Sequence, residues 1–297
     1  MKAFKRCLQV FHPACRRLLG RSKAKQFVIH TASHCIGINM RASFNFNQKL
    51  AFLVVIAGLM IIAVFLLPPI PQDAAYHQFA DKNSYYGVSN FWNVLSNLPF
   101  LLTGLLGLWE LDRGRLAILP EFRVGYLTFF IGVALVGPGS AYYHWTPDNA
   151  SLLWDRLPMT IAFMALFAIV IAEYLSVAAA KRLLWPMVLI GIFSVFFWYI
   201  TELNGHGDLR PYVVVQFLPI LLMPLILLFF QPTFSGAAYI WAMIGAYAGA
   251  KLAESLDEPI FRFFHVISGH SLKHLLVALG VYYFWQGLRR RKKLASD

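Results

Sequence analysis

The sequence predicts an all-α integral membrane protein, a seven-transmembrane-helix bundle preceded by one extra N-terminal transmembrane helix. Hydrophobic residues make up 59% of the 297 residues and charged residues only 13%, whereas soluble globular proteins carry about 25% charged residues. Apolar segments of the length that crosses a bilayer, about 20 residues, recur along the chain. The connections between them are short and hold much of the charge. Together these observations exclude an ordinary soluble domain.

The apolar segments divide the chain into five regions. A basic extension, residues 1–48, precedes an anchor helix expected at 49–67, and a polar connecting segment, 68–89, follows it. Residues 90–288 are expected to form the seven-helix domain, and residues 289–297 a basic tail. Within the domain, helices are expected near 90–110, 122–144, 153–175, 182–202, 212–230, 237–254 and 270–288.

The extension 1–48 is basic, and the first 49 residues hold ten Lys or Arg and no Asp or Glu. This composition is typical of an organelle transit segment, and Met40 is an equally plausible start of the protein. All three cysteines, Cys7, Cys15 and Cys35, lie in this extension. The helical domain therefore offers no thiolate, and a metal site there must use His and carboxylate side chains.

The placement of basic residues predicts the orientation in the membrane. The extension, the connections that hold Arg113 and Lys181, and the run Arg-Arg-Arg-Lys-Lys at 289–293 all fall on one side. An excess of Lys and Arg marks the cytoplasmic side, so both termini are expected in the cytoplasm. The opposite face is expected to meet the periplasm or a lumen. Because these basic residues flank apolar helices, they do not indicate a nucleic-acid partner.

Five polar residues within or at the ends of the expected helices indicate a functional site, because such residues are costly in a membrane. Ser140 and His144 stand four residues apart at the end of one helix, and His270 and His274 do so at the start of the last. Residues at this spacing share a helix face. Asp155 lies near the start of the helix that follows His144. Counting helices across the membrane places the three histidines and Asp155 at the non-cytoplasmic side, and Ser140 lies one turn before His144.

Three neutral imidazoles are a suitable ligand set for catalytic zinc, which keeps its fourth position open for water. Zinc lowers the pKa of such a water and polarises a bound carbonyl. The segment His-x-x-x-His lacks the Glu that serves as the base in His-Glu-x-x-His metalloproteases. Asp155 is therefore the expected acid/base residue and Ser140 the expected oxyanion donor. Taken singly, these residues also fit structural roles, such as an Asp in the first turn of a helix.

The combination closely resembles the alkaline ceramidases, members of a seven-helix hydrolase superfamily that includes the adiponectin/progestin-type receptors. Segment 91–97, Phe-Trp-Asn-Val-Leu-Ser-Asn, is similar to the family's first-helix motif, and 155–159, Asp-Arg-Leu-Pro-Met, to its Asp-x-Leu-Pro-Met. The resemblance covers about residues 81–288. It implies zinc held by His144, His270 and His274, with Asp155 as acid/base and Ser140 as transition-state stabiliser. The implied substrate is a ceramide-like membrane lipid, cleaved to a sphingoid base and a fatty acid, and no obligate protein partner is expected.

The segment before the first core helix departs from the family pattern. The eukaryotic enzymes carry a calcium site there, with a Glu directly before Phe-Trp-Asn, whereas this chain has Asn90 at that position. Oxygen ligands remain in Asp81, Asn83 and Asn90, so a weak calcium site is one expectation. A helix cap formed by Asn90 is the other.

Three alternative functions stay open. Zinc chemistry acts on esters as well as amides, so another lipid amide or ester is an alternative substrate. A progestin/adiponectin-type receptor would have a similar zinc site, although the 91–97 motif favours the ceramidases. A transporter or retinal protein is the third alternative. Lys273 would form the Schiff base of a retinal protein, but it is expected about 100° around the helix from His274 and reaching toward the membrane interface.

Overall fold

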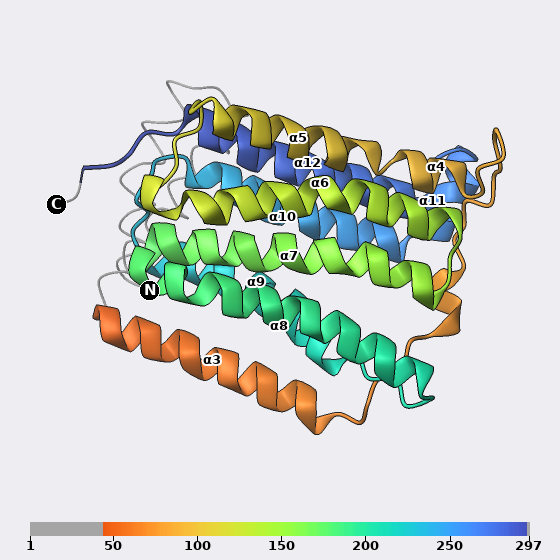
Figure 1. The fold of residues 1–297 in the computed structure, drawn as a ribbon, viewed down its shortest axis with the longest axis horizontal. Helices are drawn as coiled ribbons and strands as arrows, with labels where there is room; N and C mark the ends of the chain where they lie inside the picture. The colour runs from red at the N-terminus through yellow and green to blue at the C-terminus, as the bar shows by residue number, and fades with distance from the viewer. Residues whose placement is uncertain (1–43, 296–297) are drawn as a thin grey trace, which may run out of the picture.

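The computed structural model describes residues 44–295, so the predictions for residues 1–43 and 296–297 lie outside the described residues. The described part is helical and contains no β-strand. Its long helices run roughly side by side (Figure 1). They are α3 (Phe46–Leu66), α5 (Leu98–Asp112), α6 (Arg123–Trp145), α7 (Asn149–Tyr174), α8 (Val177–Leu203), α9 (Arg210–Phe229), α10 (Ala237–Ser255) and α12 (Gly269–Arg290).

Short helices occupy the connections: η1 (Ala74–His77), α4 (Phe91–Leu95), η2 (Pro120–Phe122) and α11 (Asp257–Phe264). Two long helices begin earlier than the apolar pattern predicts. The Asp148 carboxylate accepts the backbone N–H of Ser151 and starts α7 at Asn149. The Ser176 hydroxyl accepts the N–H of Ala179 and starts α8 at Val177. A polar cap extends each helix beyond the apolar segment, because it satisfies N–H groups at the helix end.

Six of the described helical segments are long and apolar enough to cross a membrane. They are Phe46–Leu66, Phe91–Asp112, Pro120–Trp145, Asn149–Tyr174, Val177–Leu203 and Arg210–Phe229. The predicted fold class, an all-α multi-pass membrane protein, is therefore confirmed. Helices α10 and α12, of 19 and 22 residues, are not among the six. The expected count of seven helices plus one stays a prediction.

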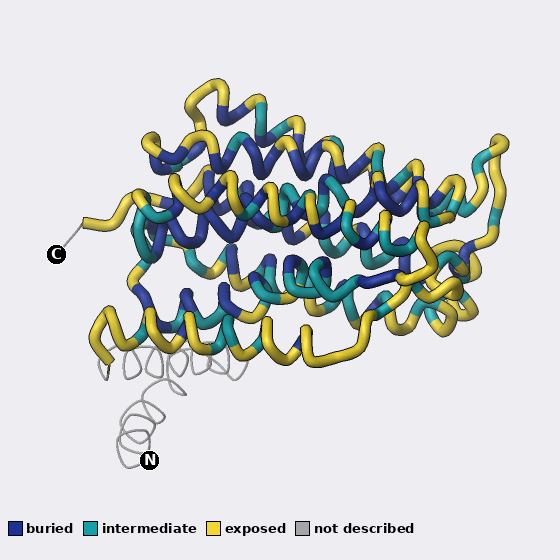
Figure 2. Tube along the Cα trace, turned by 60° about the horizontal axis from the view of Figure 1, so that its bottom comes forward, coloured by how far each residue is buried: buried dark blue, intermediate teal, exposed yellow. Residues whose placement is uncertain are grey.

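Helix α3 lies at one edge of the bundle (Figure 1) and packs against α9. Phe46 and Phe52 make edge-to-face contacts with Phe230 and Phe229. Most of the remaining α3 surface is apolar and exposed (Figure 2). An apolar helix with so little protein contact fits a lipid environment, where exposed hydrocarbon is not costly.

Helix α7 lies at the centre of the bundle, between α6 and α8 and against α9. Ala165, Ala168, Ile169 and Val170 along it are fully buried. Helix α12 packs mainly against α10 and also beside α5. Consecutive helices run in opposite directions, so the start of α7, the end of α6 and the start of α12 lie at the same end of the bundle (Figure 1).

A buried ion pair closes the opposite end. The Arg291 guanidinium donates to both oxygens of Glu173 at 2.6 and 2.8 Å, and the Tyr126 hydroxyl donates to the same carboxylate at 2.5 Å. Arg291 also donates to the carbonyl oxygen of Ala117. Arg291, the first residue after α12, is thus bonded to the end of α7 and the start of α6. This structural role adds to any effect of its positive charge on membrane topology.

We expect Arg291→Ala to lower the free energy of unfolding by about 3–5 kcal/mol, because it leaves the Glu173 carboxylate buried without a counter-ion. Arg290→Ala is the matched control, since Arg290 is exposed. Thermal unfolding of both variants in the same detergent measures the difference. Equal melting temperatures would show that the buried pair does not stabilise the bundle.

Candidate functional site

The end of α6 and the start of α7 bring Ser140 and Asp155 together. The helices approach so closely at Gly139 that a Cβ atom there would collide with the carbonyl oxygen of Trp154. That carbonyl lacks its usual helical donor, because Pro158, four residues later, has no N–H. The glycine and the proline thus set the helix spacing. The next residue on each helix belongs to the site: Ser140 and Asp155 are both buried, and both line the same pocket.

The start of α12 brings His270 and His274 to the same end of the bundle, where they meet His144 from α6. The ring centroids lie 4.7 to 4.9 Å apart, and one nitrogen from each ring can be chosen so that all lie within 4.8 Å of one another. All three rings are buried. The three predicted ligands therefore converge in space. Among the described residues, they form the one group of His, Cys, Asp and Glu side chains capable of holding a metal ion.

The motif at 91–97 holds α12 in place. The side-chain oxygen of Asn93 accepts hydrogen bonds from the hydroxyls of Ser271, at 2.6 Å, and Ser268, at 3.1 Å. Ser268 in turn caps α12 by accepting the N–H of Ser271. Asn93 is fully buried and joins α4 to the start of α12. One amide group therefore fixes the turn of α12 that carries both histidines.

Ser96, on the same motif, orients His274. Its hydroxyl donates to the Asn93 carbonyl oxygen at 3.0 Å and lies 2.8 Å from Nδ1 of His274. Because the single hydroxyl proton goes to the carbonyl, Ser96 accepts a hydrogen bond from Nδ1–H. This tautomer, assigned from the bonding pattern, leaves the Nε2 lone pair of His274 free. A metal-binding histidine typically gives its other N–H to such a neighbour.

The donor set fits a zinc ion. Buried neutral imidazoles are ordinary zinc ligands. Nδ1 of His144 is buried and has no hydrogen-bond partner in the described structure. Buried polar nitrogens are rarely left in that state, so a ligand at this position would satisfy an otherwise orphaned group. Zinc binding itself stays part of the proposal below.

Lys273 does not extend toward the membrane interface as expected. Its side chain is only 17% exposed, and Nζ lies 2.9 Å from Nε2 of His270 and 2.8 Å from a carboxylate oxygen of Glu254. Glu254 also pairs with Lys251 one turn earlier on α10. The expectation was wrong because it rested on the position of Lys273 near a helix end, whereas residues three apart on a helix, such as His270 and Lys273, are neighbours.

Phe79 covers the histidine group from the connecting segment. Its ring makes edge contacts with His144 and His270, with centroids 4.6 and 4.7 Å apart, and it is 5% exposed. An apolar cover of this kind excludes water and strengthens electrostatic interactions beneath it. Nothing in the sequence pattern of segment 68–89 indicated this role.

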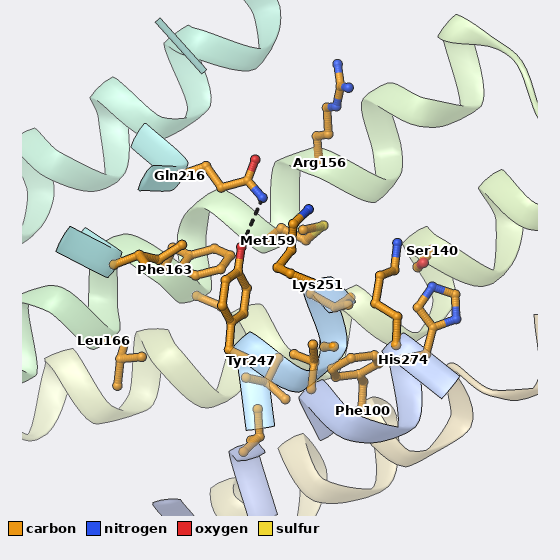
Figure 3. Close-up of a pocket in the computed structure, with 18 of the residues that line it drawn as sticks. Phe100, Ser140, Arg156, Met159, Phe163, Leu166, Gln216, Tyr247, Lys251 and His274 are labelled. Carbon is orange, nitrogen blue, oxygen red and sulfur yellow. Dashed lines mark hydrogen bonds between the residues drawn. The ribbon is translucent and has the colours of Figure 1, made fainter. Parts of the chain in front are cut away.

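A pocket of about 310 Å³ opens beside the candidate site residues Ser140, Asp155 and His274. It runs along α6, α7, α9, α10 and α12. Ser140 and His274 lie at one end, and Phe163 and Leu166 lie at the other (Figure 3). Asp155 also lines the pocket. From Asp155 to Leu166 the helical rise gives a length of about 16 Å. The pocket is therefore amphipathic: its polar end carries the site, and its deeper wall is apolar, which fits a lipid with one reactive polar group.

Two of the three residues expected to bind calcium, Asp81 and Asn90, have other side-chain partners. Asp81 is fully buried, and its carboxylate accepts backbone N–H groups of Asn83, Trp92 and Asn93. Burial raises the pKa of this carboxyl group, although the three N–H groups act in the opposite direction. Asn90 does not cap α4 through its side chain, and instead donates to the His144 carbonyl oxygen at 2.8 Å. Calcium binding stays a prediction.

We expect Gly139→Ala to lower the free energy of unfolding by about 1–3 kcal/mol, because the added methyl group overpacks the contact between α6 and α7. Gly245→Ala on α10 is the matched control, since a Cβ there meets no atom. Alanine favours a helix over glycine by about 1 kcal/mol, so the control should be unchanged or more stable. Thermal unfolding checks both variants. An unchanged melting temperature of Gly139→Ala would mean that α6 and α7 can move apart without loss of stability.

Comparison with known proteins agrees with this geometry. No curated protein matches the chain significantly. The family model described as Ceramidase matches residues 83–227, which hold the 91–97 motif, Ser140, His144 and Asp155. The match ends before α10 and α12, so His270 and His274 rest on the sequence spacing and the structure. This match supports assignment of the chain to the Ceramidase family.

Proposed function

We propose that the protein is a membrane-embedded, zinc-dependent amidohydrolase that cleaves the N-acyl amide bond of ceramide-like lipids to a sphingoid base and a fatty acid. The observation that carries this proposal is the convergence of three buried imidazoles with Asp155 and Ser140 at the polar end of an amphipathic pocket. The match of residues 83–227 to the Ceramidase family model supports amide hydrolysis of a lipid of this class.

In this proposal His144, His270 and His274 hold the zinc. When bound, zinc supplies Lewis-acid polarisation of the substrate carbonyl and activates water for attack near neutral pH. Asp155 accepts the proton of the attacking water and returns it to the amide nitrogen as the carbon–nitrogen bond breaks. Ser140 donates its hydroxyl hydrogen to the oxygen on which negative charge develops. Phe79 and the aromatic wall of the pocket exclude bulk water.

The same proposal places the site at the periplasmic or lumenal face and both termini in the cytoplasm. The support is the excess of Lys and Arg expected on the side of the termini. In the fold, α3 begins and α12 ends at the end of the bundle opposite the histidines (Figure 1). The substrate would enter laterally from the leaflet nearest the site.

We expect Asp155→Ala to abolish hydrolysis of a fluorescent ceramide while most of the bound zinc remains, because Asp155 moves protons and is not a ligand. His270→Ala should lose both zinc and activity. Hydrolysis and zinc content of purified protein are measured together, with Asp112→Ala, exposed at the far end of α5, as the control. Normal turnover by Asp155→Ala would refute its role. Bound zinc without ceramide turnover in the unmodified protein would point to another lipid amide or ester.

A second prediction concerns the orientation of His274. Ser96→Ala should weaken zinc binding about 10- to 100-fold, the usual effect of removing a residue that orients a metal ligand. Ser194→Ala is the matched control, because Ser194 is also buried but bonds only to the Gly191 carbonyl in its own helix. Competition with a chromophoric chelator measures both affinities. Equal affinities would show that Ser96 does not support the metal site.

A further inference from the structure

Arg156 is a buried cation at the polar end of the pocket. It directly follows Asp155 on α7 and lines the same cavity (Figure 3). Only 5% of the residue is exposed. Its guanidinium lies over three aromatic rings, 4.2 Å from Trp198, 4.8 Å from Tyr212 and 5.6 Å from Tyr76, measured to the ring centroids. These rings hold the guanidinium in a fixed position.

The hydrogen bonds of Arg156 are incomplete. Nη2 donates to the side-chain oxygen of Gln72 at 2.7 Å, which ties the connecting segment to α7. Nη1 is buried and has no partner in the described structure. No described carboxylate forms an ion pair with Arg156. The contact with Gln72 therefore explains the position of Nη2. It leaves Nη1 without an acceptor and the guanidinium without a counter-ion.

The two lysines of the pocket are already paired. Lys251 and Lys273 both contact Glu254, and Asp155 forms no ion pair with either lysine or with Arg156 among the described residues. The pocket lining thus holds three cations, Arg156 and the two lysines, against two carboxylates. Cation–π contacts offset part of the cost of burying a guanidinium, but a buried charge without a hydrogen-bonded partner remains unfavourable. An anionic group in the pocket would supply the missing counter-charge for this guanidinium.

We propose that Arg156 is a headgroup subsite that binds a phosphate ester of the lipid substrate. A guanidinium is always protonated, and its planar fork matches phosphate oxygens. Asp155 and Arg156 are separated by about 1.5 Å along the axis of α7 and by about 100° around it. The reacting amide and the bound phosphate therefore lie at the same depth in the pocket. The lipid class that fits is an N-acyl amino lipid with a phosphate ester on the carbon next to the amide-bearing one. This inference rests on the proposed function and narrows its substrate class.

The test compares ceramide with ceramide 1-phosphate of identical chains, using the purified full-length protein. The unmodified protein should hydrolyse the phosphorylated lipid with at least tenfold higher kcat/KM, because one charge-assisted contact is lost with the neutral lipid. Arg156→Gln should lower this ratio at least tenfold, and Arg156→Lys should restore part of it. Arg262→Gln is the control, because Arg262 is exposed, lies outside the pocket and keeps the ratio unchanged.

Binding of the two lipids, measured by native mass spectrometry, separates the two proposals. The subsite would be overturned if the unmodified protein hydrolysed ceramide with no preference for the phosphorylated lipid. It would also be overturned if Arg156→Gln lowered kcat/KM equally for both lipids. Either result would leave the proposed hydrolase function intact. Binding of the phosphorylated lipid that depends on Arg156, without hydrolysis of either lipid, would keep the subsite and overturn the hydrolase. If neither Arg156 variant folds, failure of ceramide 1-phosphate to compete with ceramide hydrolysis in the unmodified protein would overturn the subsite. Phosphodiester and monoester headgroups are compared in the same assay.

Discussion

The contact between three buried imidazoles from α6 and α12 is the constraint on which the rest of this structure depends. Three ring nitrogens facing one another give little stability by themselves, because a buried nitrogen without a donor is unfavourable. Surrounding groups therefore hold the helices in position: Asn93 bonds to the first turn of α12, and Asp257 accepts the N–H groups of His270 and Ala80. The local cost at the site is offset by bonds outside it, as is common at functional sites.

The two ends of the bundle have different roles: one end stabilises the fold, and the other carries the candidate site. At the end away from the site, Glu173, Tyr126 and Arg291 form a saturated buried cluster, in which each carboxylate oxygen has a charged donor. At the other end, several polar atoms lack partners and a pocket is open. Helix α7 is buried along most of its length and carries both Asp155 and Glu173. The buried central helix thus connects the closed end of the bundle to the end that lines the pocket.

Much of the site followed from the sequence, since a four-residue spacing fixes a helix face and helix counting fixes a membrane side. Those two rules place Ser140, His144, Asp155, His270 and His274 together without any knowledge of packing. They fail for Lys273, whose position depends on Glu254 of another helix, and for Phe79, which lies in a segment with no periodicity. Helix starts at residues 149 and 177 were missed because caps are polar. Tertiary contacts and caps carry no apolar period, so periodicity could not reveal them.

Selectivity in such a pocket must come from its polar end. A hydrocarbon chain that leaves a bilayer for an apolar cavity exchanges one apolar surrounding for another, so the transfer itself discriminates little between lipids. A buried guanidinium behaves differently, because a lipid that leaves it unpaired forgoes a charge-assisted bond. Arg156 lies beside the proposed catalytic carboxylate and is held by Trp198, Tyr212 and Gln72. Recognition of the headgroup at Arg156 therefore also positions the amide, and the same bond contributes to choosing the lipid and to orienting it for hydrolysis.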